Sequence, residues 1–150
     1  MALWQFDVHF VPAQAQLPTL KDEGWVLPLL PDQFIQDACG VLSARMGSPW
    51  MMCEGIYVFG NEVGSRVDLV PDVTVGAELL ARIDARAESI PFCEFLCELA
   101  LRIDCKFLAP ELQISIEPRR QALVDALMRS RSWSYAVAPA EALRRLADLE

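Results

Sequence analysis

The chain has 150 residues, of which 53% are hydrophobic and 23% charged, and this balance allows a buried core and excludes a disordered chain. The net charge of −8 argues against binding to nucleic acid or to an anionic membrane surface, since both need a basic face.

The N-terminal segment "MALWQFDVHF" lacks the basic and apolar parts of a signal peptide, and no uncharged apolar stretch is long enough to cross a bilayer. We therefore expect a cytoplasmic protein. Five cysteines, an odd number without the spacing of a disulfide scaffold, are typical of a reducing compartment. They are Cys39, Cys53, Cys93, Cys97 and Cys105.

The first third of the chain predicts a strand, a loop and a helix. Residues 3–11 alternate apolar and polar side chains, as a half-buried strand does. Residues 12–31 contain four prolines and no clear period, which indicates a loop. A helix is expected from Asp32 to about Met46, although Gly40 disfavours it.

A three-strand meander is predicted over about 55–86. The connector "MGSPWMM" precedes the first strand, "GIYVF", and "GNEVG" then reverses the chain into "SRVDLV". A three-residue turn, "PDV", leads into Thr74–Arg86 and keeps apolar side chains opposite one another. This register places Val67 opposite Ala77 and Arg66 opposite Glu78.

The second half of the chain alternates helices and short strands. Pro91 begins the clearest helix, "CKFLA" and "LQISI" predict two short strands, and "PRRQALVDALMRSR" predicts a helix with Pro118 in its first turn. "WSYAV" predicts a short strand, and "PAEALRRLADLE" a final helix. This order favours a single α+β domain over 1–150, a mainly antiparallel sheet with helices packed on one face.

A row of charged residues follows the last two strands of the meander and is expected on the solvent side of the sheet. It could be a solvated face, a docking face for a partner or a reaction site. Leu80 offers an apolar anchor within it, and "WMM" at 50–52 offers a second. The predicted partner-binding residues are Arg66, Asp68, Glu78, Leu80, Arg82 and Asp84.

Metal and cofactor sites are not expected. Cys93 and Cys97 lie one helical turn apart, but no CxxC pair accompanies them, and they border an apolar stripe where cysteine is commonly a core residue. His9 is the chain's single histidine and shares a strand face with Asp7. This pair permits acid–base chemistry, so a small hydrolase that uses Asp7, His9 and nearby carboxylates is an alternative.

The run "FGNEVGSRVDL…ELLARIDAR", followed by "DCKFL" and "SRSWSYAVAP", resembles a group of small, mostly uncharacterised bacterial α+β proteins over about residues 54–140. Some proteins of this general kind are immunity proteins, which neutralise a toxin made by the same cell. The resemblance implies protein binding and transfers no catalytic residue.

These observations lead to a working hypothesis of a non-enzymatic protein that binds another protein, such as a basic toxin domain, through the charged sheet face. The alternatives are the hydrolase and a homo-oligomeric structural protein, for example a homodimer. A row buried beneath a helix would contradict the docking face. A concave pocket around His9 with a perturbed carboxylate is what the hydrolase requires.

Overall fold

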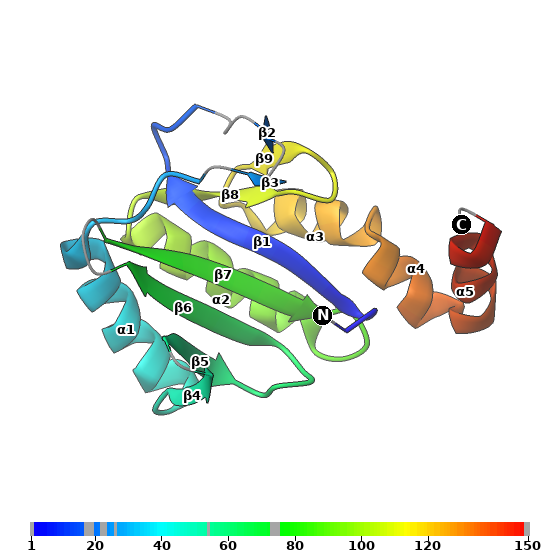
Figure 1. The fold of residues 1–150 in the computed structure, drawn as a ribbon, viewed down its shortest axis with the longest axis horizontal. Helices are drawn as coiled ribbons and strands as arrows, with labels where there is room; N and C mark the ends of the chain where they lie inside the picture. The colour runs from blue at the N-terminus through cyan, green and yellow to red at the C-terminus, as the bar shows by residue number, and fades with distance from the viewer. Residues whose placement is uncertain are drawn as a thin grey trace.

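The first strand in the sequence, β1 (Gln5–Pro12), lies inside the sheet, between β7 and β8 (Figure 1). The computed structural model describes residues 2–16, 20–21, 24–25, 27–53, 55–72 and 76–148. Seven antiparallel strands in this part of the chain have the order β4-β5-β6-β7-β1-β8-β9. The other six are β4 (Trp50–Cys53), β5 (Ile56–Gly60), β6 (Arg66–Asp72), β7 (Gly76–Asp84), β8 (Cys105–Ala109) and β9 (Ile114–Ile116).

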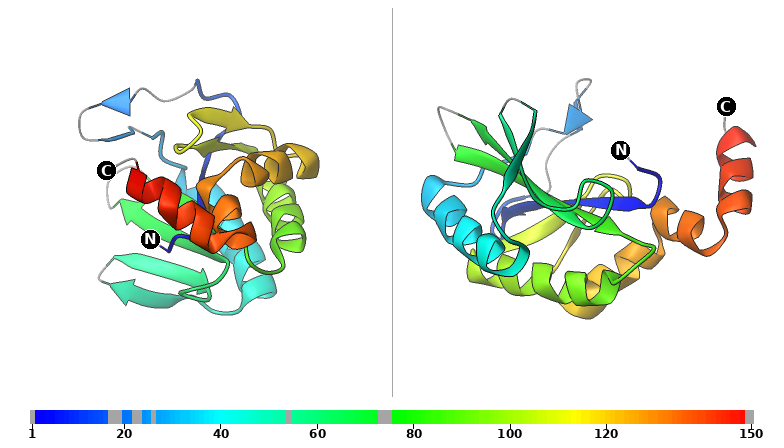
Figure 2. Two further views of the ribbon diagram at one scale, coloured as in Figure 1. Left: turned by 90° about the vertical axis from the view of Figure 1, so that its right-hand side faces the viewer. Right: turned by 90° about the horizontal axis from the view of Figure 1, so that it is seen from below.

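The helices α1 (Asp32–Met46), α2 (Ser89–Arg102) and α3 (Arg120–Met128) lie on one side of the sheet (Figure 2). Their apolar stripes meet the apolar face of the strands because helical and strand periodicities each gather such side chains on one side. Leu42, Leu96 and Leu123 are fully buried there, as are Phe6 and Phe107 from the sheet. The predicted α+β fold, with a meander β5-β6-β7 and helices on one face, is confirmed.

The predicted register of the β6–β7 hairpin is wrong by four residues. Val67 pairs with Ala81 and Arg66 with Arg82, because β6 continues through Pro71 instead of turning there. Proline is tolerated at this position because the pairing of β5 with β6 has already ended at Leu69, so Pro71 has no partner to donate to on that side. An even shift leaves the apolar side chains on the core face. The last part of the predicted turn, Val73, lies outside the described residues.

Three further predictions need correction. The connector before β5 contains an edge strand, β4, hidden from a sequence pattern by the turn residues that precede it. The predicted loop 12–31 carries a small hairpin of β2 (Leu20–Lys21) with β3 (Gly24–Trp25), and the residues between these strands lie outside the described part. The predicted helix at 118–131 begins at Arg120, so Pro118 precedes it.

The predicted strand "WSYAV" is a helix. It belongs to α4 (Arg131–Val137), which starts where the Ser130 side chain accepts a hydrogen bond from the backbone N–H of Trp133. This N-cap outweighs the strand propensity of the aromatic residues. α4 leads into α5 (Pro139–Asp148), and the two helices, called the arm below, extend beyond the end of the sheet (Figures 1 and 2). The predicted final helix is thus confirmed.

Candidate functional site: a groove between the sheet and the arm

Most of the charged row forms a buried ion-pair network. Arg66 and Asp68 are only 6% and 2% exposed. Oδ2 of Asp68 accepts hydrogen bonds from Nη2 of Arg66 at 3.2 Å and from Nε of Arg82 at 3.1 Å. Arg82 also donates through Nη1 to Oδ2 of Asp7, at 3.1 Å. The expected solvent exposure is therefore wrong for Arg66, Asp68 and also Asp84, which is 6% exposed.

The turn between β5 and β6 is fastened onto this face by its backbone carbonyls. The carbonyl of Glu62 accepts from Nη1 of Arg66 at 3.0 Å, and that of Gly64 accepts from Nε2 of Gln5 at 2.8 Å. The sequence alternation shows which face a side chain takes, but the turn that covers it depends on tertiary contacts. No helix in the described part of the chain covers the row; charged partners and this turn account for its burial.

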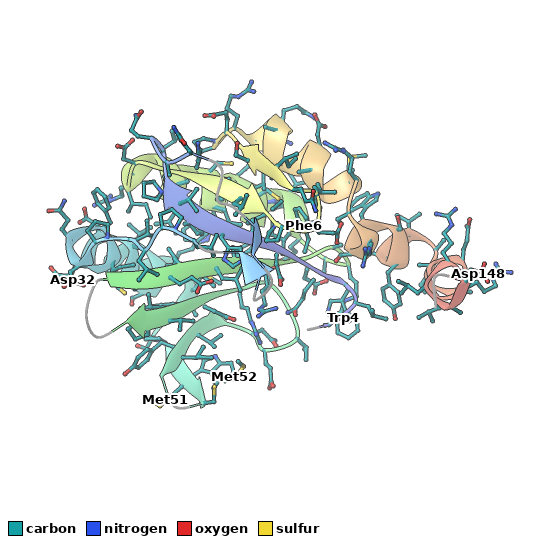
Figure 3. All side chains as sticks on the ribbon, turned by 45° about the horizontal axis from the view of Figure 1, so that its top comes forward. Trp4, Phe6, Asp32, Met51, Met52 and Asp148 are labelled. Carbon is teal, nitrogen blue, oxygen red and sulfur yellow. The ribbon has the colours of Figure 1, made fainter. Side chains whose placement is uncertain are left out.

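A second charged group fixes the start of β1 to the arm. Both oxygens of the Asp84 carboxylate accept hydrogen bonds from Arg86 at 3.0 Å, and the Arg86 guanidinium lies 3.9 Å from the centroid of the Trp4 ring. The Trp4 indole, labelled in Figure 3, donates to the carbonyl of Val63 at 2.7 Å, and its ring centroid lies 6.2 Å from that of Tyr135 in α4. This cluster orients the arm relative to the sheet.

Beyond Asp7 the network opens into a groove of about 900 Å³, called the sheet–arm groove. Its floor consists of polar side chains from β1 and β7, its near wall of two leucines that precede α1, and its far wall of side chains from the arm. The residues that matter below are Asp7, His9 and Glu78 on the floor, Leu27 and Leu29 on the near wall, and Arg131, Arg145 and Leu146 on the far wall.

The near wall is held by a bridge between Leu30 and Ala77. The Leu30 N–H donates to the Ala77 carbonyl at 2.8 Å, and the Ala77 N–H donates to the Leu30 carbonyl at 3.0 Å. Gly76 permits this approach, because a Cβ at that position would lie 2.2 Å from the Leu30 oxygen. The wall therefore has a defined position against β7.

His9 and Glu78 form a dyad on the groove floor. Nδ1 of His9 lies 3.0 Å from Oε1 of Glu78, and the side chains are 14% and 34% exposed. The contact with His9 lowers the pKa of the Glu78 carboxyl below its usual value, although partial burial opposes this. Glu78 is thus ionised at neutral pH and still reaches the groove.

Asp7 lies beside this dyad and is perturbed in the opposite direction. Burial raises the pKa of its carboxyl, while the nearby Arg82 and His9 oppose the rise. Its Oδ2 is taken by Arg82, whereas its buried Oδ1 has no hydrogen-bond partner among the described residues. The floor therefore holds a carboxylate oxygen with unused acceptor capacity.

The two serine hydroxyls at the groove are already engaged. Ser132 donates to the carbonyl of Gln5 at 2.7 Å, and Ser134 donates to that of Ser130 at 3.4 Å. Burial raises the pKa of Cys93 to about 12 and that of Cys97 to about 11, and neither thiol lines the groove. Within the described ranges, no group of three His, Cys, Asp or Glu side chains is placed to hold a metal ion.

The structure brings together some predicted site residues and separates others. Glu78 lines the groove, and Arg82 supports its floor through Asp7. Leu80 is half-buried and lies outside the lining, while Asp84 belongs to the cluster around Trp4. Asp7 and His9, the residues of the alternative hypothesis, line the groove with a perturbed carboxylate, which is the feature that alternative requires.

Sequence reasoning missed the arm's contribution to the site. Arg145 and Leu146 come from α5, and Arg131 comes from α4, whose residues were predicted as the end of the preceding helix and a short strand. Ser130, two residues before Ser132 and directly before the helix, is the N-cap signal that identifies α4.

The second predicted anchor, at 50–52, lies at the opposite end of the sheet. There the Trp50 indole donates to the Gly60 carbonyl, while Met51 and Met52 are exposed (Figure 3).

Comparison with protein-family models, curated proteins and solved structures gives no match for this chain. The resemblance to small bacterial α+β proteins therefore rests on the residues quoted above. Among the described helices, none has the length and apolarity needed to cross a membrane.

Proposed function

We propose that this chain is a non-enzymatic binding protein that takes an apolar segment of another protein into the sheet–arm groove. The observation that carries the proposal is the far wall. α5 packs chiefly against α4, and it turns Ala142 and Leu146 towards the groove opposite Leu27 and Leu29. An amphipathic helix with so little cover from its own chain is typical of a surface that a partner completes.

A protein partner fits this groove better than a small substrate. Its volume of about 900 Å³ is at the upper end of the range for small-molecule pockets, and one wall is an arm that extends beyond the sheet. The two serine hydroxyls at the wall are committed to backbone carbonyls, so neither is paired with the His9–Glu78 dyad as a nucleophile.

The partner class that we propose is a toxin domain with a basic surface, which the chain would neutralise as an immunity protein. The net charge of −8 would accelerate association with such a partner through long-range attraction. In this proposal Arg66, Asp68 and Asp84 act beneath the surface by positioning Arg82 and the arm, while Glu78 makes the direct contact. Leu80 and Arg82 contribute to the margin of the interface.

Two leucines of α5 provide a matched test. Leu146 lines the groove, whereas Leu143, 47% exposed on the same helix, does not. Leu146→Asp should abolish capture of the partner from a lysate of the source cell, and Leu143→Asp should leave it unchanged. Circular dichroism verifies that both variants are folded. Equal capture by both variants, or capture of nothing by the wild type, would contradict the proposal.

The hydrolase is the second candidate, favoured by the His9–Glu78 contact in a concave site beside a perturbed carboxylate. In this function His9 would accept a proton from the attacking water, and Glu78 would orient the imidazole. A panel of ester and phosphoester substrates tests it with wild type beside His9→Gln. Turnover by the wild type that is lost in the folded variant would replace the binding proposal with an enzyme.

A further inference from the structure

We infer that the groove floor receives one cationic side chain of the partner, an arginine or a lysine whose head group pairs with Asp7 and Glu78. This inference rests on the proposed function and names the chemistry of the anchor that the groove selects. It follows from three features of the floor: its supply of hydrogen-bond acceptors, its charge, and the apolar walls above it.

The floor presents carboxylate oxygens to a ligand. Arg82 donates to Asp68 through Nε and to Asp7 through Nη1, and Nδ1 of His9 faces Glu78. Among the acceptors of the groove floor, Oδ1 of Asp7 has no partner but is buried, so a ligand reaches it only if the floor side chains shift, whereas part of the Glu78 carboxylate already reaches the groove. A ligand that satisfies these oxygens must donate hydrogen bonds.

The charge of the cluster also favours a cation. The cluster holds two arginines and three carboxylates: Arg66 and Arg82 pair with Asp7 and Asp68, and Glu78 pairs with His9. One negative charge is therefore uncompensated whenever His9 is neutral and the three carboxyls are ionised. A guanidinium or ammonium group that enters from the groove would complete the pairing and would form charge-assisted hydrogen bonds in a partly dry site.

The walls of the groove suit the aliphatic part of an arginine or lysine side chain and limit the number of cationic side chains that can enter. Leu27, Leu29 and Leu146 can pack against the aliphatic carbons of an arginine or lysine while its head group reaches the floor. Arg131 lines the far wall and would repel a second cation nearby, while Arg145 on the same wall is paired with Glu141. The groove thus fits an apolar segment with a single basic residue and disfavours a polybasic one.

The single histidine of the chain makes this inference directly measurable. In a proton–carbon correlation spectrum of protein freed of any tag, the His9 imidazole is the one histidine signal, and it lies on the groove floor. The probes are N-acetyl-Leu-Arg-Leu-amide and its lysine, citrulline and norleucine counterparts. We expect the arginine or lysine peptide to shift the His9 signal in a saturable manner at millimolar concentration, and the uncharged peptides to bind about tenfold more weakly.

A carboxylate outside the groove supplies the matched control. Glu78→Gln should weaken the cationic peptide about tenfold, whereas Glu98→Gln, exposed on α2 and outside the groove lining, should leave its affinity unchanged. Intrinsic fluorescence gives the affinity independently of the His9 signal. If both substitutions weaken peptide binding equally, the effect comes from the overall negative charge of the protein and not from a contact with Glu78. That result would overturn the inference.

The remaining outcomes are also decisive. Equal binding of the arginine and citrulline peptides would contradict the cationic anchor. The proposed function of the groove would still stand if Leu146→Asp abolished the binding of both peptides. If methylguanidinium binds as tightly as the peptide, the groove floor is a site for small free cations. That result would contradict the inference that the cation is a side chain of a partner protein. No shift of the His9 signal with any probe would overturn the inference, and the lysate capture would still decide the proposed function separately.

Discussion

Oδ2 of Asp68 accepts a hydrogen bond from Nε of Arg82 at 3.1 Å across the β6–β7 pair, and the Asp68 side chain is only 3% exposed. The same oxygen also accepts from Arg66. A carboxylate removed from water in this way is tolerated only because two guanidinium groups surround it. The charged row is thus a structural network that supports the groove floor through Asp7.

Loss of the central carboxylate should destabilise the fold strongly. In Asp68→Asn the two arginines lose their shared negative partner inside the molecule, and we expect the free energy of unfolding to fall by about 3–5 kcal/mol. Urea denaturation followed by circular dichroism measures this change.

An exposed ion pair of the same length provides the control. Nε of Arg120 lies 3.1 Å from Oε1 of Glu94, and both side chains are about half exposed. Glu94→Gln should therefore change the free energy of unfolding by less than about 1 kcal/mol. Similar changes in the two variants would show that burial of the network contributes little.

Two glycines should respond to alanine in opposite directions. Gly40 lies within α1, and a Cβ added there would have no heavy atom within 4 Å, so Gly40→Ala should raise the free energy of unfolding by about 0.5–1 kcal/mol. Gly76 has a φ of +135° and lies against the Leu30 carbonyl. Gly76→Ala should lower the free energy of unfolding by about 1–3 kcal/mol.

The second substitution should also change the groove. Because the added methyl group would displace Leu30, the amide signals of residues 27–30 should shift in Gly76→Ala and stay in place in Gly40→Ala. Thermal unfolding and an amide correlation spectrum measure both effects. Unchanged signals for 27–30 in Gly76→Ala would show that the bridge to Ala77 does not hold the near wall.

Regular periodicity made much of the fold predictable. The apolar alternation of β1 and β7 and the stripe of α2 identify these elements and their buried faces, since both follow from local geometry. The exposure of the charged row was not predictable in the same way. The pattern places Arg66 and Asp68 opposite the helices, but their burial depends on the turn at 61–65 and on cross-strand ion pairs that only the folded sheet creates.

The groove could be predicted only in part. Asp7 and His9 share a strand face, and that was visible from their spacing. The dyad depends on the β1–β7 pairing, which places His9 opposite Leu80 and brings Glu78 within reach along the same face. The far wall depends on α4, where an N-cap at Ser130 outweighs strand propensity. Sites assembled from distant segments carry little local signal.

Four of the five cysteines should differ sharply in reactivity. Cys53 is exposed on the edge strand, whereas Cys93, Cys97 and Cys105 are buried, and burial raises the pKa of each of these three thiols to about 11 or 12. Iodoacetamide should therefore modify Cys53 first and reach the three buried thiols only when the protein unfolds. Mass spectrometry of timed samples measures this order, and Cys53→Ser should remove the fast phase. Labelling of Cys93 at the rate of Cys53 would contradict the burial.

Glu78 should stabilise the fold in a pH-dependent way. Contact with His9 holds the pKa of its carboxyl below the usual 4.5, so the folded state binds this proton less readily than the unfolded state does. The stabilisation is then fully present above pH 4.5 and is lost as the pH falls through the folded-state pKa. The difference in unfolding free energy between wild type and Glu78→Gln should shrink as the pH decreases below 4.5. A difference that grows there would contradict the assignment.

Asp7 should show the opposite dependence. Burial raises the pKa of its carboxyl above 3.8, so between that value and the raised pKa the folded state retains a proton that the unfolded state has lost. Wild type should therefore lose stability relative to Asp7→Asn as the pH rises through this interval. Urea unfolding of wild type and both variants, repeated from about pH 3 to pH 7, measures the two slopes in one experiment. The two carboxylates are expected to change the unfolding free energy with pH in opposite directions. If the pH dependences of Asp7 and Glu78 have the same sign, the two carboxylates share one environment, which contradicts the opposite pKa shifts described above.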